Sequence, residues 1–202
     1  MIGIIDYGLG NIFSLRSSIR AIGEEVTVTG DADEIRACDK LLLPGVGAFR
    51  DAANLLADTG LDTVIKEEAA HGKYILGICL GMQLLLEKSY EYGEWGGLGL
   101  IPGAIRPIKE AIAEDLLIPQ IGWNALTLYH DHPIFADTGQ GDYVYFVHSY
   151  YADAAPEHVI ATTEYGAALT AAVAKDNVIG CQFHPEKSGP VGLKILKRFC
   201  DL

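Results

Sequence analysis

The stretch Tyr74-Ile75-Leu76-Gly77-Ile78-Cys79-Leu80-Gly81 combines a short apolar run with a cysteine that lies between two glycines. The run as far as Ile78 predicts a buried strand, and Gly81 to Glu87 predicts the beginning of a helix. Glycines two positions before and after Cys79 are typical of a nucleophile elbow, a strained turn between a strand and a helix. The stretch therefore predicts an α/β sheet with the sulfur of Cys79 exposed at its upper edge.

The residues before Cys79 alternate between short apolar runs and helical patterns. The expected strands are Ile2–Ile5, Val26–Val28 and Leu41–Leu43. One expected helix begins after Asn11, which can act as its N-cap. A second helical region covers Ala48–Ala70, with an interruption near Gly60. Alternation of this kind implies parallel strand pairing with right-handed crossovers.

The second half of the chain changes character. Four β-rich runs are separated by short turns, namely Tyr143–Val147, His158–Thr163, Leu169–Val173 and Val178–Phe183, and Val191–Phe199 predicts a closing helix. We interpret these runs as an antiparallel extension of the sheet, and Gly93–Gly103 as a loop. The prediction is one α/β domain over residues 1–202, with an open mixed sheet, a mostly parallel core and helices on both faces.

Composition excludes several classes of function. The chain has 202 residues, half of them hydrophobic, and a formal net charge of −12. A chain this acidic is not expected to bind nucleic acid or an anionic membrane surface, because binding to either requires basic residues on the protein. Its four cysteines include no pair at the spacing of a zinc or redox motif, and the N-terminus lacks a signal-peptide pattern. No apolar run reaches the ~18 residues of a membrane span. We therefore expect no metal site and a reduced, cytoplasmic compartment.

A cysteine nucleophile needs a base, and the base needs an orienting carboxylate. The segment Gln182-Phe183-His184-Pro185-Glu186 offers both, with His184 as the base and Glu186 as the carboxylate. Each residue taken alone has an ordinary structural explanation, since a buried free cysteine is usually inert. Together they predict a cysteine-histidine-acid triad.

The turn Pro44-Gly45-Val46-Gly47 follows a buried strand, where open α/β sheets place their active-site loops. Its backbone amides can point at a developing oxyanion, as can the amide of Leu80 directly after the nucleophile. An ordinary strand-end turn is the alternative explanation. The turn lacks the Lys-Ser/Thr pair that a phosphate-binding loop requires.

These motifs resemble the class I (triad) glutamine amidotransferases, whose fold is flavodoxin-like, and the resemblance covers the whole chain. It rests on Gly77 to Gln83, on His184-Pro185-Glu186 and on the Pro44–Gly47 turn. Four further segments are similar to the glutaminase subunits of imidazole glycerol phosphate synthases within that family: Asp6–Asn11, Gly122-Trp123-Asn124, Phe146–Tyr151 and His184–Ser188.

The resemblance implies that Cys79 attacks the side-chain amide of glutamine, giving a glutamyl thioester and ammonia, with His184 moving the proton and Glu186 orienting it. It also implies a partner, a (β/α)8-barrel cyclase subunit that uses the ammonia to make imidazole glycerol phosphate and an aminoimidazole carboxamide ribotide in histidine biosynthesis. It implies no cofactor.

Further roles follow from the resemblance by position. The residues that would hold glutamine are Gln83, Glu91, Ser149 and Tyr150, and those at the cyclase interface are Asn11, Trp123 and Lys187. Gly45, Val46, Gly47 and Leu80 match the oxyanion positions. Trp123 and Lys187 also have structural alternatives to an interface role: Trp123 could belong to the hydrophobic core, and Lys187 could be a solvated surface charge. One departure is visible, since Gln120 occupies a position where the family often has histidine, and an amide cannot carry charge.

Three alternatives remain open from the sequence. The first is the glutaminase subunit of another synthase, for pyridoxal phosphate or anthranilate. The second is a cysteine peptidase-like protein of the same fold, which would often place histidine directly after the cysteine, where this chain has Leu80. The third, a catalytically silent subunit, conflicts with the intact triad.

Overall fold

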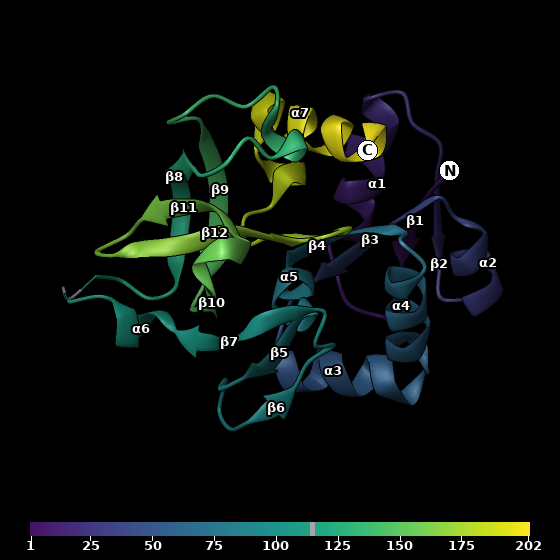
Figure 1. The fold of residues 1–202 in the computed structure, drawn as a ribbon, viewed down its shortest axis with the longest axis horizontal. Coiled ribbons are helices and arrows are strands. Elements are labelled where there is room, and N and C mark those ends of the chain that lie inside the picture. The colour runs from purple at the N-terminus through teal and green to yellow at the C-terminus, as the bar shows by residue number, and fades with distance from the viewer. Residues whose placement is uncertain (114–115) are drawn as a thin grey trace.

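The computed structural model describes residues 1–113 and 116–202 and is built around a nine-stranded sheet (Figure 1). In spatial order the strands are β2 (Val26–Thr29), β1 (Ile2–Ile5), β3 (Lys40–Gly45), β4 (Tyr74–Cys79), β13 (Val178–Cys181), β12 (Ala168–Lys175), β11 (Val159–Glu164), β8 (Gln120–Leu128) and β9 (Tyr143–His148). Pairing is parallel from β2 to β13 and antiparallel from β13 to β9. The predicted mixed sheet with a parallel core and an antiparallel extension is confirmed, with one correction: β13, which the sequence analysis assigned to the extension, pairs parallel with β4 and joins the core.

Helices cover both faces of this sheet, as predicted (Figure 1). One face carries α1 (Ile12–Ala21) and α7 (Gly189–Asp201), and the other carries α2 (Ala32–Ala37), α3 (Phe49–Asp58), α4 (Leu61–Ala70) and α5 (Leu80–Leu85). The short helix α6 (Ile108–Ala111) and three 3-10 turns, Pro133–Phe135, Pro156–His158 and Pro185–Lys187, lie in connections. Alternate residues of β3 face opposite cores, because successive side chains of a strand point to opposite sides.

A second sheet of four strands was not predicted. Its order is β10 (Tyr150–Ala154), β7 (Ile101–Pro107), β5 (Leu86–Ser89) and β6 (Trp95–Gly96). The expected helix from Gly81 to Glu87 therefore ends at Leu85, and the expected loop Gly93–Gly103 contains β6 and the start of β7. The reason is tertiary: the amides of residues 97–100 donate to the carbonyls of residues 84–87, which would otherwise continue the helix.

Two local predictions about helices have different outcomes. The helical region Ala48–Ala70 is interrupted at Gly60, which adopts a φ of +71° between α3 and α4, as expected. Helix α1 does begin after Asn11, but the Asn11 side chain makes no capping hydrogen bond. It donates to Glu186 instead. In the described part of the chain, every helix is too short or too polar to cross a membrane.

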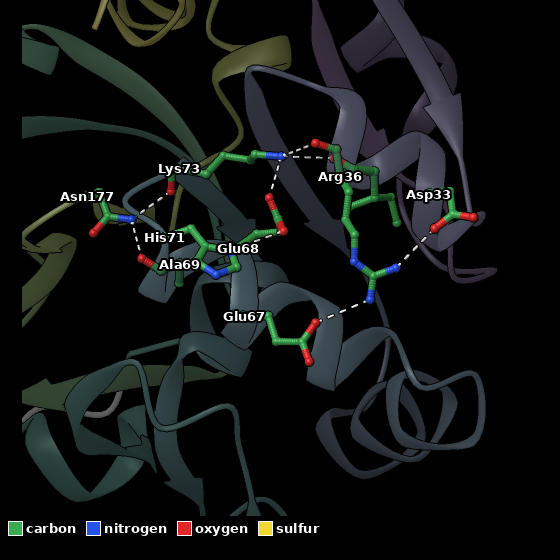
Figure 2. Close-up of polar contacts among 9 residues, drawn as sticks. Asp33, Arg36, Glu67, Glu68, Ala69, His71, Lys73 and Asn177 are labelled. Atoms are coloured by element: carbon green, nitrogen blue, oxygen red, sulfur yellow. Dashed lines mark hydrogen bonds and ion pairs between the residues drawn. The ribbon is translucent and has the colours of Figure 1, made fainter.

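At the amino-terminal end of the parallel strands, Lys73 ties α4 to α2 (Figure 2). Its Nζ lies 2.5 Å from Glu68 Oε2 and donates to the carbonyls of Ile35 and Arg36. Burial alone would raise the pKa of Glu68, but Lys73, with a smaller contribution from His71, outweighs it and holds the pKa below its ordinary value. This ion pair contributes stability above the ordinary pKa of a glutamate, and the contribution is lost as pH falls.

Lys73→Met is expected to destabilise the fold by about 2 kcal/mol, because it leaves the Glu68 carboxylate buried without its cation. Urea denaturation at pH 7 measures this. The matched control is Lys66→Met, which removes a more exposed ion pair, to Asp62, on α4, the helix that also carries Glu68. This variant should lower the free energy of unfolding by less than about 0.5 kcal/mol. Equal losses in the two variants would contradict the structural role of the Lys73–Glu68 pair.

Candidate active site

Cys79 ends β4 and directly precedes α5, in the elbow that the sequence predicts. Its φ is +55°, a strained value for a residue with a side chain. The flanking glycines are required by close packing. A Cβ on Gly81 would lie 1.8 Å from the carbonyl oxygen of Leu43, and a Cβ on Gly77 would lie 2.7 Å from the backbone of Gly81. The tight turn therefore depends on both glycines, as the elbow pattern implies.

His184 reaches Cys79 through strand pairing. β13 lies parallel to β4 with Cys181 opposite Ile78, so the chain just beyond β13 passes beside the elbow. His184 is 2% exposed, and its Nδ1 lies 2.9 Å from Glu186 Oε1. Asn11 Nδ2 also donates to that oxygen, at 3.3 Å. The structure thus places His184 in contact with Glu186, with Asn11 behind the carboxylate, and places His184 and Cys79 on the wall of one cavity.

The charge of His184 is set by these neighbours. Burial alone would lower its pKa, but hydrogen bonding to Cys79 and to Glu186 outweighs burial and raises the pKa to about 9. The imidazolium is therefore the stable form at neutral pH. A protonated His184 beside Cys79 holds a proton ready for a leaving group.

The amide hydrolysis predicted from the sequence is expected to have its alkaline limb near pH 9, where His184 loses the proton that the leaving amine needs. Glu186→Gln removes the negative charge beside the ring and should move this limb to lower pH, because the imidazolium loses its stabilising partner. The measurement is kcat/KM against pH for both proteins. An unchanged limb in Glu186→Gln would contradict the assignment of the limb to His184.

The Pro44–Gly47 turn lies next to the nucleophile, because Gly45 at the end of β3 pairs with Cys79 at the end of β4. Gly45 is enclosed: a Cβ there would lie 2.8 Å from both the amide of Gly81 and the hydroxyl of Tyr7. That hydroxyl donates to the carbonyl of Pro44 at 2.8 Å. Val46 and Gly47, which follow Gly45 in the turn, line the cavity beside Cys79.

A cavity of about 430 Å³ opens at Cys79. Predicted residues that line it besides Cys79 and His184 are Val46, Gly47, Leu80, Gln83, Glu91, Ser149, Tyr150 and Lys187, and residues that were not predicted to line it are Tyr92, Pro119, Val147 and His148. Val147 and His148 belong to the quoted segment Phe146–Tyr151, and Tyr92 follows the predicted residue Glu91. The described residues contain no group of three His, Cys, Asp or Glu side chains that could hold a metal ion.

Two predicted glutamine-binding residues are held firmly at the cavity. Gln83 Nε2 donates to the Gln182 side chain at 3.0 Å and to the Tyr150 carbonyl at 3.2 Å. Glu91 accepts from the backbone amide of Phe49 at 2.5 Å. An anionic carboxylate in a concave site can recognise a ligand ammonium group, so the pair suits a zwitterionic amide ligand.

Trp123 and Lys187 lie on one surface beside the cavity. Trp123 is 53% exposed, which rules out the alternative that it is simple core. The Trp123 ring packs edge-on against the Tyr145 ring, with 6.0 Å between the ring centroids, and Lys187 Nζ lies 5.8 Å from the centroid of the Tyr145 ring. Ile121, on the same strand as Trp123, is also exposed. Tyr145 was not predicted, although it precedes the quoted segment Phe146–Tyr151 by one residue.

Gln120 is fully buried and lies 2.9 Å from His148, whose other ring nitrogen faces the Tyr150 carbonyl at 2.8 Å. Burial, with a smaller effect from the charge of His184, lowers the pKa of His148 to about 4 although the Tyr150 carbonyl opposes it. His148 is therefore neutral at physiological pH. Gln120 thus keeps a polar contact to the ring without carrying charge.

Comparison with known proteins places this geometry in a family. The sequence profile described as "Glutamine amidotransferase class-I" matches residues 3–201. The chain belongs to this family. It is 48% identical to the "Imidazole glycerol phosphate synthase subunit HisH" of Caldanaerobacter subterraneus, covering 100% of this chain and 98% of the relative. It is 49% identical to the protein of the same name from Bacillus cereus, covering 98% and 93%.

Solved structures share the fold of this glutamine amidotransferase at low identity. A "Crystal structure of glutamine amidotransferase" superposes with a TM-score of 0.76 at 17% identity, covering 99% of this chain and 97% of the other. The "Structure of PurLQS from Thermotoga maritima" superposes with a TM-score of 0.77 at 20% identity and the same coverage. At these identities the likeness supports the fold alone.

Proposed function

We propose that this glutamine amidotransferase is the glutaminase subunit of an imidazole glycerol phosphate synthase and acts in histidine biosynthesis. The observation that carries the proposal is identity of 46–49% over nearly the whole length to relatives that bear this name. The triad at the cavity supports it. We further propose that residues 1–202 act as one domain in the cytoplasm.

The chemistry follows from the positions of Cys79 and His184. The sulfur of Cys79 attacks the side-chain carbonyl carbon of glutamine, and the amides of the Gly45–Gly47 turn and of Leu80 stabilise the oxyanion. His184 gives its proton to the nitrogen as the C–N bond breaks, which leaves a glutamyl thioester and ammonia. Glu186 keeps the ring oriented and compensates its charge.

Water completes the cycle. It attacks the thioester carbonyl and passes a proton to His184, and the C–S bond then breaks to release glutamate and regenerate the sulfur. Gln83, Glu91, Ser149 and Tyr150 hold the amino-acid part of the substrate at the cavity wall. No cofactor enters any of these steps.

We assign the surface around Trp123 and Lys187, together with Asn11, to the contact with a (β/α)8-barrel cyclase subunit. Exposed aromatic side chains are typical anchors of protein interfaces. Asn11 reaches Glu186 from the position just before α1, so a contact made at this end of α1 can influence the triad directly. Ammonia released at Cys79 then enters the partner without passing through bulk water.

The decisive experiment mixes the purified chain with the cyclase of the histidine pathway and, separately, with the synthase subunits for pyridoxal phosphate and for anthranilate. We expect a stable complex only with the first, and glutamine-dependent synthesis of imidazole glycerol phosphate. Glutaminase activity should be low in the isolated chain, since uncoupled hydrolysis wastes glutamine. Selective binding to another synthase would overturn the proposal, and peptidase activity without glutaminase activity would favour the peptidase alternative.

A further inference from the structure

We propose that Gln182 is a positioning residue that fixes the orientation of Gln83 and directs an N–H group at the sulfur of Cys79. The inference deepens the proposed function, on which its meaning for glutamine turnover rests. Gln182 is fully buried just after β13, two residues before His184. Its backbone amide donates to the carbonyl of Ala171 and holds this part of the chain against β12.

The side chain of Gln182 touches both functional residues. Its Nε2 lies 3.7 Å from Cys79 Sγ, within hydrogen-bond range for sulfur, and its Oε1 accepts from Gln83 Nε2 at 3.0 Å. Gln83 Nε2 donates its second hydrogen to the backbone carbonyl of Tyr150 at 3.2 Å. The contacts form a continuous line from Tyr150 through Gln83 and Gln182 to the nucleophile.

The orientation of both amides follows from the first member of this line. A backbone carbonyl can only accept, so the group that Gln83 turns toward Tyr150 must be its NH₂. The same NH₂ faces Gln182, which must therefore present its oxygen there. The NH₂ of Gln182 is then left for the sulfur. The fixed carbonyl of Tyr150 thus determines, through two side chains, that Cys79 receives a donor.

Two consequences follow for the reaction. An N–H directed at sulfur stabilises the thiolate more than the thiol, because a charged acceptor forms the stronger hydrogen bond. Both hydrogens of the Gln83 amide are used within the protein, so only its oxygen remains for a ligand in the cavity that it lines. Gln83 therefore selects a ligand group that donates, such as an amide or ammonium N–H.

The test compares Gln182→Met, which is similar in size but neither donates nor accepts comparably, with Thr163→Val. Thr163 is equally buried and donates to the Ala125 carbonyl between β8 and β11, away from the cavity. We expect Gln182→Met to slow alkylation of Cys79 by iodoacetamide about tenfold, and to raise the KM for glutamine with the cyclase present. Thr163→Val should change Tm but neither of these quantities. Ammonia-dependent synthesis should be unchanged in both.

Gln182→Leu also removes the N–H group and decides the question if the methionine variant does not fold. We expect the same slowing of alkylation, about tenfold, and a raised KM for glutamine. Wild-type alkylation in a folded Gln182 variant would overturn the proposal. Alkylation needs neither glutamine nor partner, so its outcome is independent of the proposed function, which is tested separately by complex formation with the cyclase.

Discussion

Cys79→Ala is expected to abolish glutamine-dependent synthesis by the complex and to leave ammonia-dependent synthesis intact. Without the sulfur no thioester can form, and loss of a nucleophile in an assembled triad typically costs about 10⁴-fold or more in kcat. The partner's own reaction needs only ammonia, so ammonium salts should restore it. The measurement is the rate of imidazole glycerol phosphate formation with glutamine and, separately, with ammonium chloride.

The matched control is Cys200→Ala. Cys200 is 8% exposed, as is Cys79, but it lies in α7 away from the cavity. Burial raises the pKa of the Cys200 thiol to about 12, with a smaller effect from Glu24, so it should be unreactive at neutral pH. We expect this variant to keep its glutamine-dependent rate. Retained glutaminase turnover in Cys79→Ala would show that another group is the nucleophile.

Gly81→Ala should produce the second-largest effect. The added Cβ would lie 1.8 Å from the carbonyl oxygen of Leu43, which is backbone and cannot turn aside, so the elbow must shift away from β3. A displacement of about 1 Å at a nucleophile can cost about 100-fold in rate. Overpacking of a buried turn should also cost about 3 kcal/mol of folding free energy. Both quantities are measured with glutaminase assays in the complex and urea denaturation of the chain alone.

Gly96→Ala is the control for this substitution, because a Cβ at Gly96 meets nothing within 4 Å. It should leave the rate unchanged and the stability within about 0.5 kcal/mol of the wild type. If Gly81→Ala behaved like Gly96→Ala, the close approach of the elbow to β3 would not limit catalysis.

The parallel core could be predicted because its strands carry their own signal. Ile2–Ile5 and Leu41–Leu43 are buried on both faces and therefore read as continuous apolar runs. The second sheet could not be predicted in the same way. β6 has two residues and β5 has four, and β5 replaces a helix only because residues 97–100 supply hydrogen bonds from elsewhere. No local pattern encodes such a contact.

Some residues of the candidate site could likewise be predicted from the sequence, and others could not. Cys79, His184 and Glu186 could be predicted because their chemistry requires particular residue types at elbow and loop positions. Gln182, His148 and Tyr145 could not, since an amide, a ring or a phenol in or beside a strand has many ordinary explanations. Only the pairing of β13 with β4 brings Gln182 to the sulfur. Asn11 was predicted at the partner interface, and the structure adds its hydrogen bond to Glu186.

Mass spectrometry of the acid-quenched complex during glutamine turnover tests the central claim most directly. Cys79 as nucleophile predicts a glutamyl adduct that maps to the peptide containing Cys79. The adduct should be absent from Cys79→Ala and present in Cys200→Ala. An adduct on any other residue, or an adduct that persists in Cys79→Ala, would contradict the account.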